Sequence, residues 1–160
     1  VPEAEEPHPT FVENALAKAR NAARHTGLPA LADDSGILVP ALNGEPGVHS
    51  ARYAGEPRSD ARNNARLVDR LRAAPSRAAY YYCLILVLRH AEDPQPLIAE
   101  GQWHGEIVLE PRGAGGFGSD PHFLLPELGL TAAELDPEHK NRISHRGQAL
   151  AMLANALKAL

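Results

Sequence analysis

The longest apolar run of the chain, residues 80–88, sets the strongest limit on its fold. It is far shorter than the roughly 18 apolar residues that cross a bilayer, and no other run approaches that length, so we expect no membrane partner. A short apolar run followed by turn residues is typical of a buried strand. We therefore predict strands over 80–89 and 97–110, joined by a turn that contains Pro94 and Pro96.

Capping residues and helical periodicity predict helices on both sides of these strands. Thr10 and Glu13 match a capping box, and Gly27 is a typical helix stop. A second helix is predicted over 59–73, and Ser144 is expected to cap the last one. Short strands are predicted at 28–32 and 123–125, and helical turns at 131–135 and 137–141, while residues 37–42 form a further apolar segment. This order indicates an α/β or α+β fold, and 160 residues suit a single domain, 1–160.

Charge and cysteine content narrow the class of protein further. A net charge of −4 argues against a nucleic-acid partner, because such a partner favours long-range attraction to phosphates. Cys83, the only cysteine, lies inside an apolar run, so we expect a buried hydrophobic side chain rather than a reactive thiol. One cysteine cannot form an internal disulfide, and no secretory signal pattern opens the chain, so we expect a cytoplasmic protein.

The sharpest local signal is the tetrapeptide Asp33-Asp34-Ser35-Gly36, which follows a predicted buried strand. Two carboxylates at a strand end lie where open α/β folds bind their ligands. Mg²⁺ uses one or two carboxylates together with waters and phosphate oxygens, so this acidic tip is a candidate metal site. An ordinary Asp/Ser/Gly turn is the alternative interpretation.

The segment 113–120 is too rich in glycine to be explained by packing. Glycines let backbone N–H groups approach an anion or a flat base closely, and Phe117 could stack on a base. The segment is neither a Walker A loop nor a dinucleotide fingerprint. A hairpin loop whose phenylalanine folds back into the core is the alternative.

Lys140, His145 and Arg146 gather around the predicted start of the last helix. Cations at a helix N-terminus oppose the macrodipole, whereas a bound anion would make the arrangement favourable. A locally disfavoured placement points to function, although an exposed, screened helix start is also compatible with it.

Three other charged residues have simple interpretations when taken singly. Capping explains Glu13 without a catalytic role. Lys18 follows five residues later, which is not the favoured spacing of a helical ion pair, so it reads as a solvated lysine. Glu6 also reads as solvated.

Together these segments resemble the inosine/xanthosine triphosphate pyrophosphatase family, whose members are Ham1-like. The matching stretches occur in family order and cover essentially the whole chain. Each alone is weak, but five in register are specific: residues 10–20, 31–36, 46–55, 115–121 and 140–150.

The resemblance implies a long, twisted mixed sheet with flanking helices, two lobes around a central substrate cleft, and a homodimer. It implies hydrolysis of non-standard purine nucleoside triphosphates (ITP, dITP, XTP) to the monophosphate and pyrophosphate, with Mg²⁺ as cofactor. Charge neutralisation on the triphosphate and a positioned water are what such chemistry needs.

The resemblance also implies roles for individual residues. Asp34 matches the catalytic carboxylate that activates water and holds Mg²⁺, and Glu6 matches a second metal ligand. Glu13 and Asp33 match supporting carboxylates. Substrate-contacting positions are matched by Lys18, Ser35, Phe117, Gly118, Ser119, Asp120, Lys140, His145 and Arg146.

A 6-oxo purine presents an acceptor where adenine presents an amino donor. A cationic donor such as Arg146 therefore favours hypoxanthine and xanthine, and it faces adenine with an unpaired donor.

Two departures from the family pattern bear on activity. Family members begin with a further segment that carries a strand and a phosphate-gripping loop, and without it we expect weak or no activity. Ser119 stands where the family has an aromatic residue, whose loss would weaken packing around the base by about 1 kcal/mol. A related pyrophosphatase of other specificity, or a nucleotide-binding relic without activity, is the alternative.

Overall fold

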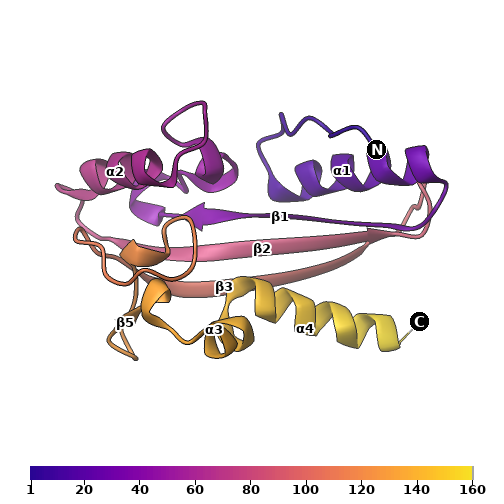
Figure 1. Ribbon diagram of the computed structural model, residues 1–160. Helices are drawn as coiled ribbons and strands as arrows, with labels where there is room; N and C mark the ends of the chain where they lie inside the picture. Colours follow the sequence, from indigo (N-terminus) through magenta and orange to yellow (C-terminus); the bar gives the residue numbers. More distant parts are fainter. Residues whose placement is uncertain (160) are drawn as a thin grey trace.

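A five-stranded sheet forms the centre of the computed structural model, which describes residues 1–159 (Figure 1). The strands lie in chain order, and every pairing among them is antiparallel. The predicted α/β fold with a long, twisted sheet is therefore confirmed, and the strands that the structure describes contain no parallel pair. The strands are β1 (Ala30–Leu38), β2 (Ala78–Leu88), β3 (Leu97–Ile107), β4 (Phe123–Leu125) and β5 (Leu130–Thr131).

Helices cover both faces of the sheet. In Figure 1, α1 and α2 lie on one side, and α3 and α4 lie on the other. None of the helices within residues 1–159 is long and apolar enough to cross a membrane. Their bounds are α1 (Phe11–Thr26), α2 (Asp60–Leu71), α3 (Pro137–Ile143) and α4 (His145–Lys158), with short 3₁₀ helices η1 (Pro40–Leu42), η2 (Gly47–Arg52), η3 (Asp120–His122) and η4 (Ala132–Glu134).

The predicted caps of α1 are confirmed. The Thr10 hydroxyl accepts a hydrogen bond from the Glu13 backbone N–H and donates one to the Glu13 carboxylate. Gly27 ends the helix in the left-handed conformation that glycine adopts without strain. Between these caps, small side chains let α1 lie close against β1 and β2, and the buried ones are Ala15, Ala19 and Ala23.

One expectation for β1 is wrong. The strand predicted at 28–32 continues to Leu38, and the tetrapeptide that starts at Asp33 lies inside it rather than at a strand end. Its backbone is held in the sheet by β2, where Asp34 lies opposite Leu84 and Ser35 lies opposite Cys83. Because β1 is the outermost strand of the described sheet, its polar side chains remain near solvent although its backbone is paired.

Three groups of buried side chains stabilise the sheet. One joins α1 to β1 and β2, one joins α4 to β2 and β3, and the largest joins α2 to the end of the sheet that holds Tyr81, Trp103 and Phe123. Cys83 is fully buried under α4, and burial raises the pKa of its thiol to about 11. The expectation of a buried, unreactive cysteine is thus confirmed.

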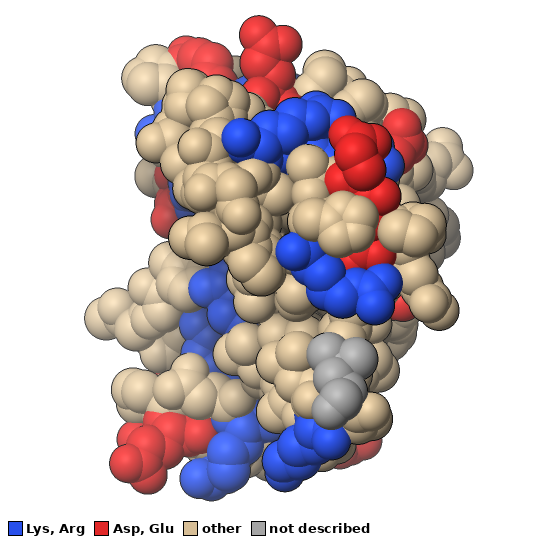
Figure 2. Space-filling model, turned by 90° about the vertical axis from the view of Figure 1, so that its right-hand side faces the viewer, with Lys and Arg blue, Asp and Glu red and all other residues tan. Residues whose placement is uncertain are grey.

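The end of the molecule that carries the C-terminal end of α4 shows mixed charges. Lysine and arginine side chains lie beside aspartate and glutamate side chains and among uncharged residues (Figure 2).

Gly101 of β3 allows α4 to approach the sheet. A Cβ atom at this position would lie 2.9 Å from the Ala149 backbone nitrogen and would also collide with the His145 carbonyl oxygen. We predict that Gly101→Ala destabilises the full-length protein by about 1–3 kcal/mol, as overpacking does. Urea unfolding measures this, and exposed Gln102→Ala on the same strand is the control, expected within about 0.5 kcal/mol of the parent. Equal stability of Gly101→Ala and the control would contradict the close approach.

Candidate active site

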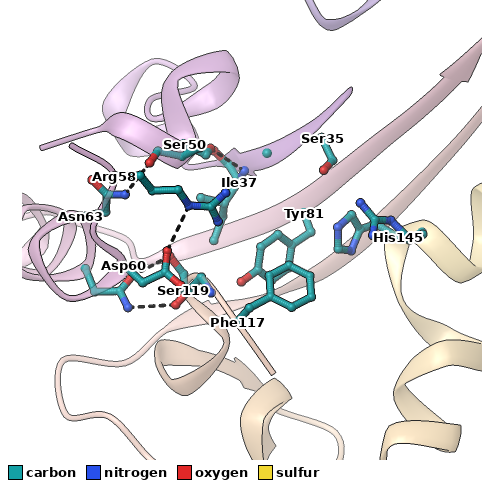
Figure 3. A pocket seen from close by; sticks show the side chains of 15 residues that line it. Ser35, Ile37, Ser50, Arg58, Asp60, Asn63, Tyr81, Phe117, Ser119 and His145 are labelled. Carbon is teal, nitrogen blue, oxygen red and sulfur yellow. Dashed lines mark hydrogen bonds and ion pairs between the residues drawn. The ribbon is translucent and has the colours of Figure 1, made fainter. Parts of the chain in front are cut away.

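A cavity of about 200 Å³ lies between the start of α2, the glycine-rich loop 113–120 and the start of α4. Side chains of β1 and β2 complete its wall, and Figure 3 shows Ser35, Asp60, Tyr81, Phe117 and His145 arranged around it. Pockets for drug-sized ligands have volumes of roughly 300–1,000 Å³. The cavity therefore suits one fragment of a ligand, such as a flat base, rather than a whole nucleotide.

Alternation along β1 sends two neighbouring carboxylates to opposite faces of the sheet. Asp34 faces α1, where its Oδ1 lies 3.9 Å from the Lys18 Nζ. Asp33 faces α4, where its Oδ2 lies 3.2 Å from the Arg146 guanidinium. Ser35 lines the cavity. One strand thus joins an acidic cluster beside α1 to a cavity beside α4.

Asp34 is the most perturbed carboxylate of this region. Burial raises the pKa of its carboxyl to about 6, and the positive charge of Lys18 acts in the opposite direction. Its Oδ1 accepts a hydrogen bond from the Ser35 backbone N–H, whereas its Oδ2 is buried and has no partner in the part of the chain that the structure describes. A raised pKa and a free lone pair suit a general base that works near neutral pH.

The acidic cluster consists of the carboxylates of Glu6 and Asp34 and the ammonium of Lys18, which lies between them. The Lys18 ammonium lies 2.6 Å from the Glu6 Oε1 and also donates to the Asp33 carbonyl oxygen. Within residues 1–159, no three His, Cys, Asp or Glu side chains lie close enough together to hold a metal by themselves. The buried, unpartnered Asp34 oxygen beside Glu6 nevertheless fits Mg²⁺, which binds through one or two carboxylates when phosphate oxygens and waters supply the rest.

A buried network supports the other end of the site. The Tyr81 hydroxyl donates to the Asp120 Oδ1 over 2.9 Å, and the Lys140 Nζ lies 2.5 Å from the Asp120 Oδ2. The same carboxylate accepts the Phe117 backbone N–H at 3.0 Å. The Lys140 ammonium also lies 4.6 Å from the centre of the Phe117 ring. Asp120 therefore joins the loop 113–120 to β2 and α3.

His145 stands at the start of α4 with its ring stacked on Tyr81, and the two ring centres are 4.7 Å apart. Burial lowers the pKa of its imidazole to about 4, and the charge of Arg146 acts in the same direction. The ring is thus neutral at pH 7, and its buried Nδ1 has no partner among the described residues. The Trp103 indole lies beside both rings, 6.1 Å from Tyr81 and 6.3 Å from His145, ring centre to ring centre.

Several predicted residues line the same cavity: Ser35, Phe117, Gly118, Ser119, His145 and Arg146. Asp120 and Lys140 stand behind it, and Glu6, Lys18 and Asp34 lie in the acidic cluster. Phe117 is 59% exposed, so its ring does not fold back into the core. The Glu13 carboxylate accepts the Thr10 hydroxyl rather than the Thr10 backbone N–H that a full capping box requires, and Glu13 lies outside the cavity wall.

Other residues of the wall were missed by the sequence patterns. The Tyr81 hydroxyl gives no signal because its strand is recognised by apolar character alone. Asp60 and Asn64 are four residues apart and so share one face of α2, a spacing that could have drawn attention to a polar helix face.

Comparison with known proteins shows to which family the chain belongs. The Ham1 family profile matches residues 1–156. The chain belongs to the Ham1 family. It is 69% identical to a curated dITP/XTP pyrophosphatase of Nitrosomonas europaea over 157 residues, which are 98% of this chain and 77% of the relative. It is 65% identical to the dITP/XTP pyrophosphatase of Chromobacterium violaceum over 160 residues, 100% of this chain and 81% of the relative.

Solved structures of Ham1 proteins share the fold. A HAM1 protein from Coxiella burnetii superimposes with a TM-score of 0.97 at 52% identity, over 100% of this chain and 82% of that one. The nucleoside-triphosphatase / dITP/XTP pyrophosphatase of Mycobacterium abscessus gives a TM-score of 0.83 at 43% identity, over 98% of this chain and 80% of that one. The Ham1 fold expected from the resemblance is therefore confirmed.

The raised pKa of Asp34 makes a prediction for the stability of this Ham1-family protein. The folded carboxyl titrates at about 6 and the ordinary one at 3.8, so the folded state binds more protons between these values and the free energy of unfolding falls as pH rises through them. Asp34→Asn removes this titration. We predict that it stabilises the metal-free, full-length protein at pH 8 by up to about 3 kcal/mol. At pH 4 the gain should be much smaller.

Urea unfolding at pH 8 and pH 4 in the presence of a chelator measures both values. Asp33→Asn is the matched control, because it removes a neighbouring carboxylate that is half exposed and paired with Arg146. Lower stability of Asp34→Asn at pH 8, or a gain of the same size at both pH values, would contradict the burial of an ionised carboxylate.

Proposed function

We propose that this protein hydrolyses non-standard purine nucleoside triphosphates, namely ITP, dITP and XTP, to the monophosphate and pyrophosphate. The observation that carries the proposal is the buried Asp34 Oδ2, which has no partner among the described residues. Asp34 lies on β1, and the next residue of that strand, Ser35, lines a cavity of a size that suits a base. The names of relatives at 65–69% identity support it. These relatives do not favour the alternatives, another specificity or an inactive relic.

Asp34 acts as the general base in this proposal. Its carboxylate takes a proton from a water molecule as the water oxygen bonds to the α-phosphorus and the bond to the pyrophosphate oxygen breaks. A pKa of about 6 leaves the group ionised at pH 7 yet basic enough to accept a proton. Lys18 neutralises phosphate charge, and Asp33 and Glu13 support the cluster. When bound by Asp34 and Glu6, Mg²⁺ supplies further charge neutralisation.

The base lies in the cavity, against Phe117. Ser35, Gly118 and Ser119 contact the nucleotide, and Asp120 holds the loop. Lys140 and Arg146 are cationic donors near the 6-oxo group, and the neutral His145 offers a ring nitrogen to the base edge. A donor-rich pocket accepts hypoxanthine and xanthine and leaves the amino group of adenine facing another donor.

The proposal also covers the domain organisation, the oligomeric state and the cellular location of the protein. Residues 1–160 belong to a single domain, and the protein is a homodimer, as the family resemblance implies. It acts on the cytoplasmic nucleotide pool, which agrees with a lone, buried cysteine.

Turnover by the full-length protein with Mg²⁺ tests the proposal. We expect release of pyrophosphate from ITP, dITP and XTP at far higher kcat/KM than from ATP, GTP or dUTP. Asp34→Asn should lose at least about a thousandfold in kcat, because its carboxylate is the group that takes the proton of the water in this proposal. Unchanged turnover by this variant excludes the catalytic role. Tight ITP binding without pyrophosphate release by the parent protein would favour a relic.

Arg146→Ala tests how the base is selected. We expect the ratio of kcat/KM for ITP to that for ATP to fall about tenfold or more, since a charged hydrogen bond to the 6-oxo group is lost. Steady-state kinetics with both substrates measures the ratio. Arg24→Ala, which removes an exposed cation from α1 far along the chain, is the control and should leave the ratio unchanged. An unaltered ratio for Arg146→Ala would contradict base reading by this residue.

A further inference from the structure

Two polar side chains of α2, those of Asp60 and Asn64, form hydrogen bonds with the glycine-rich loop 113–120. Asp60 accepts the Gly118 backbone N–H at its Oδ2 over 2.9 Å. Asn64 donates from its Nδ2 to the Gly118 carbonyl oxygen over 3.0 Å, and its Oδ1 accepts the Ser119 hydroxyl at 2.7 Å. Figure 3 shows Asp60 and Ser119 facing each other at this point. Both polar groups of one loop residue are thus held by one helix.

The loop needs such external support. Gly113, Gly116 and Gly118 all have positive φ angles, and a chain rich in glycine loses much conformational freedom when it is ordered. Phe117 is exposed, so burial of its ring does not fix the loop. Asp120 holds the segment from the side of the sheet, and the α2 side chains hold it from the opposite side.

The helix that supplies these contacts is itself rigidly placed. Leu67 and Leu71 of α2 are buried in the largest core group, and the Ser59 hydroxyl caps the helix by accepting the Arg62 backbone N–H. Because Asp60 and Asn64 lie one helical turn apart, both face the loop at the same time. Displacement of the loop would break three hydrogen bonds at once.

We infer that Asn64, together with Asp60, is a positioning residue that sets where Phe117 stands against the base. The role of Asn64 in base binding rests on the proposed function. The contact between α2 and the loop 113–120 does not depend on it. The Ser119 hydroxyl, which donates to the Asn64 Oδ1, gives the loop a further link to the same helix. Asn64 therefore governs affinity for the base rather than the chemical step.

Hydrogen exchange of the nucleotide-free, full-length protein tests the contact directly. In Asn64→Ala we expect backbone amides of residues 113–120 to exchange about tenfold faster, with no change elsewhere, the size expected for losing one or two neutral hydrogen bonds. Ser119→Ala should give a smaller change in the same segment. Asp69→Ala on the exposed face of α2 is the control and should leave the segment unchanged. Unchanged exchange in Asn64→Ala overturns the inference, whether or not the protein hydrolyses ITP.

Kinetics and binding then separate positioning from direct contact. For Asn64→Ala we expect KM for ITP and Kd for IMP, measured by calorimetry, to rise about tenfold while kcat stays within about twofold. Combined with Ser119→Ala, the two changes should be clearly less than additive, because they remove one shared contact. Full additivity, or a higher KM without faster exchange, would assign Asn64 to direct substrate binding and overturn positioning. If the parent protein lacks ITP turnover, the proposed function fails while the exchange result still decides the contact.

Discussion

The alternation of side chains along β1 is the constraint on which the site depends. In any strand, neighbouring residues point to opposite faces, so Asp33 and Asp34 cannot share one environment. Asp33 is half exposed and paired with Arg146, whereas Asp34 is only 15% exposed and lies beside Lys18. A single strand therefore places the acidic cluster within reach of the base cavity without a long loop between them. Pairing of the whole of β1 with β2 keeps that spacing rigid.

Two buried polar atoms without hydrogen-bond partners within residues 1–159 lie in the acidic cluster and in the residues around the cavity. Buried polar atoms nearly always have partners, so those without one call for an explanation. In the described part of the chain, the Asp34 Oδ2 and the His145 Nδ1 are among the buried atoms that lack one. One lies beside the carboxylate and ammonium groups that suit phosphate and metal, and the other borders the cavity that suits a base. The stability lost at both atoms is understandable if ligand atoms satisfy them.

Local patterns predicted most of the fold but only part of the site. Capping signals placed α1 and α4, and apolar runs placed β2 and β3, because these depend on neighbours in the sequence. The same logic ended the first strand before Asp33, since Asp-Asp-Ser-Gly favours a turn unless a partner strand holds it. The contacts of Tyr81 with Asp120 and of Asn64 with Ser119 join residues far apart in the chain. No local pattern encodes such pairs.

The aromatic stack beneath the cavity has a practical consequence. Trp103 is the only tryptophan of the chain, and its indole lies 5.4 Å from Phe123 and 6.3 Å from His145, ring centre to ring centre. It is buried, so bulk solvent does not dominate its emission. A ligand that touches His145 changes the surroundings of this indole. The protein therefore carries its own intrinsic fluorophore next to the cavity, and the filling of that cavity can be followed optically without any attached label.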